Sequence, residues 1–220
     1  MKLSARVVGL TQPTIELKEA GPEGLVAYCA RVSNPQHQDK EIGSLFDYCL
    51  RNKHWSIFEM ANAVVEVEAP RDITRQLLRH RSFSFQEFSQ RYSDEIEFTD
   101  REYRRQDNKN RQNSIDDLDT DTYWSVQYDV NRLGQAAYDL YRHLRSVDVA
   151  KECARVVLPE GLTMSRLYVN GTLRSWLHYL DVRDDPGVTQ WEHVLLAREI
   201  RKVLEPVFPS VFRGLNANQS

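Results

Sequence analysis

The residues best suited to chemistry lie together in one stretch, RHRSFSFQEFSQRY, which runs from Arg79 to Tyr92. It contains three arginines, a histidine, three serines and a glutamate, together with glutamines. Arginine offers two parallel donors to a phosphate or to one edge of a heterocycle, and serine hydroxyls and backbone amides can complete a cradle for an anion. We therefore expect a pocket that binds a phosphorylated, planar ligand.

A solvated helix face is the alternative interpretation of the first half of this stretch. Arg75 and Arg79 lie at helical spacing after Pro70, as the residues of an exposed face would. This interpretation explains residues 83–89 poorly, because phenylalanines alternate there with serine and glutamine. Such a pattern anchors a segment by its rings while the polar groups point the other way.

The order of these residues resembles the signature of the flavin-dependent thymidylate synthases. That signature has an Arg-His-Arg block, a gap of seven residues and a Ser-Gln-Arg block. Two fixed blocks at a fixed gap are a specific signal, although Gln86 stands where the family more often has asparagine. The matching residues are Arg79, His80 and Arg81 in the first block, Ser89, Gln90 and Arg91 in the second, and Ser84 and Glu87 between them.

Further segments resemble the same family within residues 25–95 and 148–205. Taken alone, His54 would be interpreted as a helix cap or a surface residue, and Arg155 as an ion-paired or snorkelling side chain. Arg174 and His178 are one helical turn apart and face the same way. One departure is clear: the family commonly has a histidine shortly before the residue that is Gln190 here, and this chain has Gly-Val-Thr instead.

The resemblance implies three sets of site residues and no metal site. Those expected to bind the nucleotide are Gln76, Arg79, Glu87, Ser89, Gln90, Arg91, Arg155 and Arg183. Those expected to bind the flavin are Ser33, Ser56, Glu59, Arg79, His80, Arg81, Glu87, Arg174 and His178. Those expected to take part in catalysis are Arg183, which would polarise the uracil ring, Ser89, and His54, which would lie near the flavin and the folate.

The implied reaction is the methylation of deoxyuridylate to thymidylate. Methylene-tetrahydrofolate would supply the carbon, giving tetrahydrofolate, and FAD reduced by NADPH would supply the hydride, since no amino-acid side chain donates one. Arginines aimed at the uracil edge would stabilise negative charge in the ring. The other route, attack by a cysteine thiolate, is not favoured, because Cys29, Cys49 and Cys153 are predicted to be buried in helices. The resemblance also implies a homotetramer with shared active sites.

Composition restricts the alternatives. The chain has 220 residues, a net charge of −3 and a pI of about 6.1, which argues against a general nucleic-acid binder. A phosphate- or RNA-binding module without redox chemistry remains the competing hypothesis. No apolar run is long enough to cross a membrane, and the first residues indicate a strand rather than a signal peptide. Three cysteines without a CxxC pair predict a reduced, cytoplasmic protein.

The elements that must position these residues follow from hydrophobic spacing. We expect one compact α/β domain of the α+β type spanning residues 1–220, rich in helix, with a small mixed or antiparallel sheet. Residues 100–122 are polar and highly charged, and predict an exposed excursion. The expected strands are 3–10, 63–68 and 162–169, and the expected helices are 23–32, 39–53, 70–79, 123–147, 148–159, 172–182 and 188–207.

Overall fold

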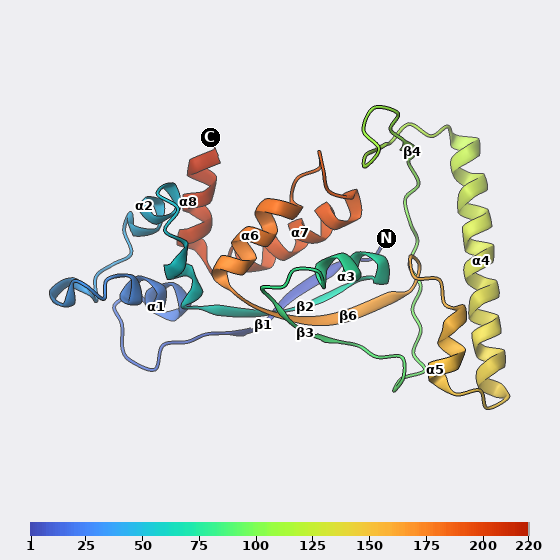
Figure 1. Cartoon of the computed structure of the whole chain (residues 1–220), viewed down its shortest axis with the longest axis horizontal. Helices are drawn as coiled ribbons and strands as arrows, with labels where there is room; N and C mark the ends of the chain where they lie inside the picture. Colours follow the sequence, from blue (N-terminus) through green and yellow to red (C-terminus); the bar gives the residue numbers. More distant parts are fainter. Residues whose placement is uncertain (220) are drawn as a thin grey trace.

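A four-stranded antiparallel sheet supports the molecule in a computed structural model that describes residues 1–219 (Figure 1). The strand order is β1-β2-β6-β3, so two strands distant in sequence, β2 and β6, form the centre. Their register runs without interruption from the pair Asn62 and Thr172 to the pair Pro70 and Met164. The bounds are Ser4–Leu10 for β1, Asn62–Pro70 for β2, Ser84–Glu87 for β3 and Met164–Thr172 for β6.

Alternation along the two central strands defines the core. Val65 and Val67 of β2 and Val169 of β6 have no exposed surface, because they face the helices. Glu66 and Tyr168, whose positions are paired across the strands, point to the opposite side of the sheet. This period of two confirms the strands expected at 63–68 and 162–169, although the first is longer, at 62–70, and the second is shifted to 164–172.

Helices cover one side of the sheet (Figure 1). The side chain of Thr172 caps α6 by accepting from the amide of Ser175 at 3.2 Å, so α6 starts directly where β6 ends. Glu23 of α1 accepts from the amides of Ser210 and Val211 and thereby caps α8. The bounds are Gly21–Ala30 for α1, Leu45–Arg51 for α2, Arg71–Leu77 for α3, Leu173–Arg183 for α6, Trp191–Leu204 for α7 and Pro209–Gln219 for α8.

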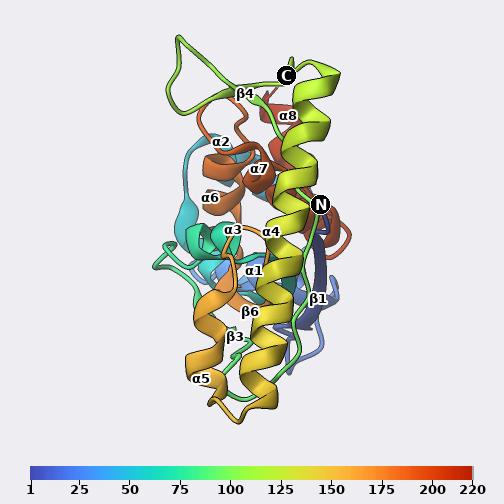
Figure 2. The ribbon, with the colours of Figure 1, turned by 90° about the vertical axis from the view of Figure 1, so that its right-hand side faces the viewer.

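A long helix stands beside this body, as the two perpendicular views show (Figures 1 and 2). Residues 100–119 precede it and contain a small hairpin, and Asp119 caps the helix by accepting from the amide of Thr122 at 2.9 Å. The bounds are Arg105–Gln106 for β4, Ser114–Ile115 for β5, Thr120–Ser146 for α4 and Lys151–Ala154 for α5. Short 3-10 helices span Pro35–His37, Trp55–Glu59 and Arg155–Val157.

Several sequence-based boundaries are wrong for local reasons. The helix expected over 39–53 begins only at Leu45, since Gly43 adopts a positive φ of 52°. The helix expected from Asp148 is reduced to α5 and a 3-10 turn, because Asp148 itself has a φ of 61° and cannot begin a helix. Residues 84–87 form the edge strand β3, and α8 was not expected at all.

The expectation that all three cysteines are buried is wrong for two of them. All three are free thiols; Cys49 is buried as predicted, Cys29 is half-buried, and Cys153 is exposed. Cys153 lies outside the core because its segment is a single helical turn rather than a long buried helix. Among the described residues, no helix combines the length and the apolar character needed to cross a membrane.

Candidate active site

A turn between α3 and β3 holds the Arg-His-Arg block against α6. Phe83 anchors this turn: it is buried, and its ring centroid lies 4.4 Å from that of Trp176. Gly171 allows this approach, since a Cβ there would lie 2.2 Å from the Phe83 ring. The backbone amides of His80 and Phe83 close the turn on Leu77 and His80, respectively. The aromatic anchor therefore leaves Arg79 and Arg81 on the surface.

Arg183 and His80 form the chemical centre of the first group of site residues. Arg183 Nε donates to His80 Nε2 at 2.9 Å, so His80 acts there as a neutral acceptor with its proton on Nδ1. Burial, followed by the positive charges of Arg183 and His178, lowers the pKa of His80 to about 4. The ring of His80 also meets the edge of Tyr179 at 5.1 Å. Arg183 is thereby held in place while its two terminal amino groups remain available to a ligand.

A second group of site residues lines a small cavity at the other end of α3. The cavity has a volume of about 130 Å³, and the residues that line it include Arg71, Arg155 and Glu87. Arg71 donates to Oε1 of the buried Gln90 at 2.9 Å, and Ser165 donates to Glu87 at 2.9 Å. Burial is the main cause that lowers the pKa of Arg71, and Arg155 contributes in the same direction. Two arginines in one small cavity make it suited to an anion.

Ser89 and Arg91 lie just after β3 beside this cavity. Ser89 Oγ accepts from the backbone amide of Arg91 at 3.3 Å, so its hydroxyl hydrogen is available to another acceptor. Arg91 forms an ion pair with Glu152 at 3.2 Å, and both side chains are more than half exposed. An exposed ion pair of this kind contributes little to stability, so a more strongly bound anionic ligand can replace Glu152 as the partner of Arg91.

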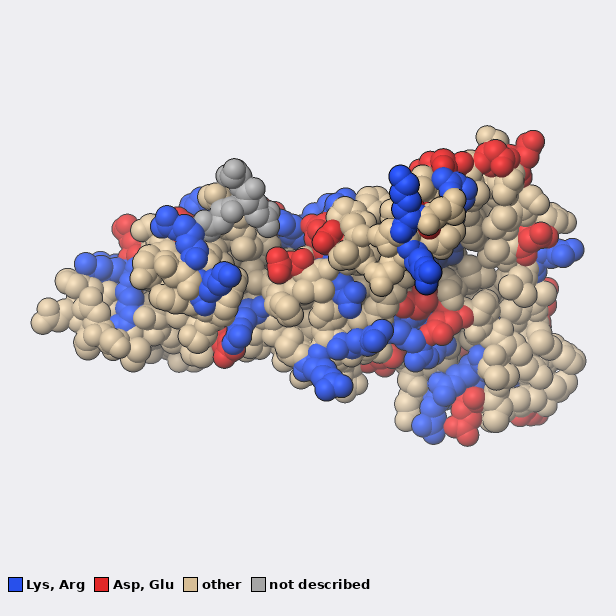
Figure 3. Space-filling view, turned by 45° about the horizontal axis from the view of Figure 1, so that its top comes forward, with Lys and Arg blue, Asp and Glu red and all other residues tan. Residues whose placement is uncertain are grey.

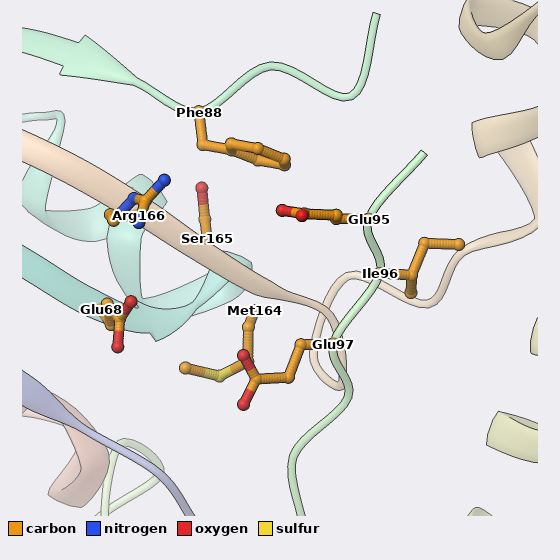
Figure 4. A pocket seen from close by; sticks show the side chains of 8 residues that line it. All are labelled: Glu68, Phe88, Glu95, Ile96, Glu97, Met164, Ser165 and Arg166. Carbon is orange, nitrogen blue, oxygen red and sulfur yellow. The ribbon is translucent and has the colours of Figure 1, made fainter. Parts of the chain in front are cut away.

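The cavity adjoining this one is acidic and does not suit a phosphate. It has a volume of about 250 Å³ and shares Phe88, Met164 and Ser165 with the anion cavity. Figure 4 shows the carboxylates of Glu95 and Glu97 on the segment that crosses opposite Ser165. The two cavities therefore differ in charge although they share a wall.

Some of the expected flavin residues form a third group around the start of α6. Arg174 forms an ion pair with Glu59, which brings α6 to the 3-10 helix that also carries Ser56. His54 directly precedes that helix, and its ring meets Tyr48 at 5.6 Å. His178 is exposed one turn after Arg174, as the spacing predicted. Ser33 is exposed between α1 and the first 3-10 helix, and within residues 1–219 no hydrogen bond or ion pair joins its side chain to this group.

Basic side chains are visible across the middle of the molecule in Figure 3, with acidic ones interspersed toward one end. Arg79 and Arg81 are both exposed, and within residues 1–219 neither forms an ion pair. Gln76 lies near the end of α3, about 8 Å along the axis from Arg71 at a rise of roughly 1.5 Å per residue. The expected nucleotide residues are thus divided between the two ends of α3.

Some residues of these groups could not be found from motifs. Arg71 follows a proline at a helix start and Ser165 lies in a strand, so neither matches a signature. His193 is fully buried on α7 and bonds to both Gln76 and Tyr179. Its one signal in the sequence is a histidine at an apolar position of an amphipathic helix.

Comparisons with known proteins identify the family to which this chain belongs. The family model described as thymidylate synthase complementing protein, Thy1, matches residues 16–210. A flavin-dependent thymidylate synthase of Synechocystis sp. is 45% identical over 97% of this chain and 99% of its own length. A probable flavin-dependent thymidylate synthase of Paramecium bursaria Chlorella virus 1 is 42% identical over the same shares.

A solved structure extends the likeness to the fold. The UMP/dUMP methylase PolB from Streptomyces cacaoi, crystallised with 5-Br UMP, superposes with a TM-score of 0.79 at 26% identity. The match covers 98% of this chain and 94% of that one. Together with the two relatives and the family model, this places the chain in the flavin-dependent thymidylate synthase family.

Proposed function

We propose that this chain methylates deoxyuridylate to thymidylate, with methylene-tetrahydrofolate as carbon donor and FAD, reduced by NADPH, as hydride source. Family membership supports the reaction class, and the two relatives carry flavin dependence in their names. The observation that carries the proposal is the cavity between Arg71 and Arg155, with Ser89 and Gln90 at its wall. Its volume and its two guanidinium groups suit the phosphate of a nucleotide.

In this proposal the phosphate binds at the second group of residues. Arg155 and Arg91 supply charge-assisted hydrogen bonds, and Ser89 donates its free hydroxyl hydrogen. Gln90 is kept in orientation by Arg71, and Glu87 by Ser165. Gln76 and Arg79 contact the nucleotide from the other end of α3, and Arg183 faces the uracil ring.

Arg183 is well suited to polarise a ring. His80 occupies its Nε–H, so the terminal amino groups point elsewhere and can donate to a carbonyl oxygen of the pyrimidine. Donors placed before reaction stabilise negative charge as it develops in the ring, with no reorganisation cost during the step. A neutral His80 matters here, because an imidazolium would repel Arg183.

The chain's residues also fit a flavin that carries a diphosphate. Arg79 and Arg81 are exposed guanidinium groups on one turn, and within residues 1–219 no carboxylate forms an ion pair with either. Arg174 and His178 present further donors on the same helix face, with Ser56, Glu59 and Ser33 as polar neighbours in the proposed site. Bound FAD, once reduced by NADPH, would supply the hydride, and His54 would lie near the flavin and the folate.

A homotetramer with shared active sites is part of this proposal, as is a cytoplasmic location. One supporting observation is the apolar surface of α4, where Trp124 and Tyr128, one turn apart, are 63% and 67% exposed. Apolar patches of this kind mark interaction surfaces. Light scattering coupled to size-exclusion chromatography gives the mass, and a mass equal to one 25.7 kDa chain would contradict the assembly.

The proposed function is tested first by the cofactor. The purified protein is expected to be yellow, or to quench the fluorescence of added FAD on binding. Calorimetry should then detect deoxyuridylate bound to the FAD-loaded protein. A colourless protein that binds neither FAD nor deoxyuridylate would overturn the proposal, and copurified nucleic acid would favour an RNA-binding module instead.

A further inference from the structure

A continuous series of side-chain hydrogen bonds runs from the core to the surface beside Gln76. The Tyr179 hydroxyl and His193 Nε2 are 3.1 Å apart, and His193 Nδ1 and Gln76 Oε1 are 3.2 Å apart. Gln76 Nε2 donates to Gln190 Oε1 at 2.6 Å, and Gln190 Nε2 donates to Glu192 Oε2 at 2.9 Å. Three helices, α3, α6 and α7, therefore meet in one network, which no signature motif encodes.

The series ends, beyond the exposed Gln190, at an ionised carboxylate. Glu192 is buried and forms an ion pair with Arg104, whose side chain is also largely buried. Burial alone would raise the pKa of Glu192, but hydrogen bonds from Arg104, from the backbone of Glu192 and from Gln190 together hold that pKa below its usual value. An ionised carboxylate accepts hydrogen bonds and donates none.

This acceptor fixes the direction of every bond in the series. The amide nitrogen of Gln190 must face Glu192, so its oxygen faces Gln76. The nitrogen of Gln76 must therefore face Gln190, and its oxygen faces His193. That oxygen cannot donate, so the proton of His193 resides on Nδ1, and its Nε2 accepts from the Tyr179 hydroxyl. Reversing the side-chain amide of either Gln76 or Gln190 would place two acceptor oxygens opposite each other.

His193 is well suited to this part, since it stays neutral. Burial, followed by the charges of Arg183 and His80, lowers the pKa of His193 to about 3. A protonated imidazole would carry hydrogen on both nitrogens and would no longer need the Tyr179 donor. At neutral pH the ring therefore has one donor and one acceptor, as the series requires.

We propose that His193 and Glu192 are positioning residues that orient the amide of Gln76, so that this side chain offers a ligand its second N–H while its oxygen faces His193. The inference rests on the proposed function, in which Gln76 binds the nucleotide. It adds a specificity: the ligand atom that meets the amide nitrogen of Gln76 is an acceptor, such as a phosphate or carbonyl oxygen, and not the ring N–H of the pyrimidine.

The same network gives the segment at 100–122 a connection to the site. Arg104 Nε donates to Ser114 Oγ across the hairpin at 2.9 Å, while its terminal nitrogen reaches Glu192. Asn110 Nδ2 donates to the carbonyl of Gly187 at 3.3 Å, which attaches the hairpin to the loop before α7. The hairpin thus supports the carboxylate that fixes the direction of the series.

The test compares variants at His193 by calorimetry with deoxyuridylate on FAD-loaded protein. In His193→Asn the amide nitrogen can replace Nδ1 and donate to Gln76, whereas His193→Leu has no donor. Loss of one neutral hydrogen bond should weaken nucleotide binding about 2- to 10-fold in the leucine variant. The asparagine variant should restore affinity to within about twofold of the native protein. FAD content, thermal midpoint and His143→Leu, an exposed histidine on α4, serve as controls.

A second variant avoids the buried position. Gln190 is exposed, so Gln190→Met should fold, yet it separates Gln76 from the carboxylate and allows both amide orientations. Nucleotide affinity should fall about twofold or more, because half of the molecules then present an oxygen. Nitrogen-15 NMR of labelled histidine should assign the His193 proton to Nδ1 in the native protein.

The possible outcomes separate this inference from the proposed function. If the native protein does not bind deoxyuridylate, the proposed function fails at that point. If the native protein binds it and both His193→Leu and Gln190→Met bind it as tightly, the positioning role is wrong. A His193 proton on Nε2 would overturn the direction of the series regardless of affinity.

Discussion

Protonation of His80 should destabilise the fold in a defined range of pH. The native His80 accepts from Arg183 Nε at 2.9 Å, and its pKa is lowered from 6.5 to about 4. The unfolded chain therefore binds this proton below about pH 6.5, whereas the folded protein does so only near pH 4. Stability is fully present above pH 6.5 and falls as the pH drops toward 4.

The size of this loss follows from the shift. A difference of about 2.5 pKa units corresponds to at most about 3.4 kcal/mol at 1.36 kcal/mol per unit. His80 is partly open to solvent, so screening reduces the value, and we expect a loss of about 1–3 kcal/mol. His193, whose pKa is about 3, adds a further loss at lower pH.

The matched variant is His80→Gln, whose side-chain oxygen can replace Nε2 as acceptor for Arg183 but does not titrate in this range. Urea unfolding at a series of pH values between 7 and 4 gives the free energy of unfolding for both proteins. All other titrating groups are shared, so the difference between the two curves isolates His80. Curves that stay parallel from pH 6.5 to 4 would refute the assigned protonation state.

Three further predictions concern the anion cavity, the turn and the cysteines. Arg155→Ala should weaken deoxyuridylate binding about 10- to 150-fold in calorimetry while FAD content stays unchanged, since a charge-assisted hydrogen bond contributes roughly 1.5–3 kcal/mol; unaltered affinity would remove Arg155 from the site. Gly171→Ala should reduce unfolding free energy by about 1–3 kcal/mol, because its Cβ would overlap Phe83, and unchanged urea unfolding would contradict that packing. Cys49→Ala and Cys153→Ala should both still form thymidylate, with about 1 kcal/mol of stability lost only at the buried Cys49; a folded, FAD-loaded variant that binds nucleotide and makes no thymidylate would identify a nucleophile.

Strong periodic patterns allowed the central fold to be predicted from sequence. Val65 and Val67 alternate with Glu66 and Glu68, which identifies a strand with one buried face. The edge strand at Ser84–Glu87 has one apolar residue among four, too few to distinguish a strand from an anchored loop. The true starts of α2 and α5 depend on single backbone angles at Gly43 and Asp148 that hydrophobic spacing does not encode.

Some residues of the candidate site could likewise be predicted from the sequence, and others could not. Fixed spacing was sufficient to single out Arg79, His80 and Arg91, because their order along the chain is itself the signal. Arg71 and His193 could not be assigned, since their importance depends on neighbours brought together by folding. The neutral state of His80 likewise depends on burial and on Arg183, which lies far away in sequence.

Formation of thymidylate itself tests the central claim most directly. Isotope-labelled deoxyuridylate is incubated with the FAD-loaded protein, methylene-tetrahydrofolate and NADPH, and the nucleotides are separated by chromatography. The account predicts labelled thymidylate in the complete mixture and none when FAD, the folate or NADPH is omitted. A protein that binds FAD and deoxyuridylate and oxidises NADPH, yet yields no thymidylate in the complete mixture, would contradict it.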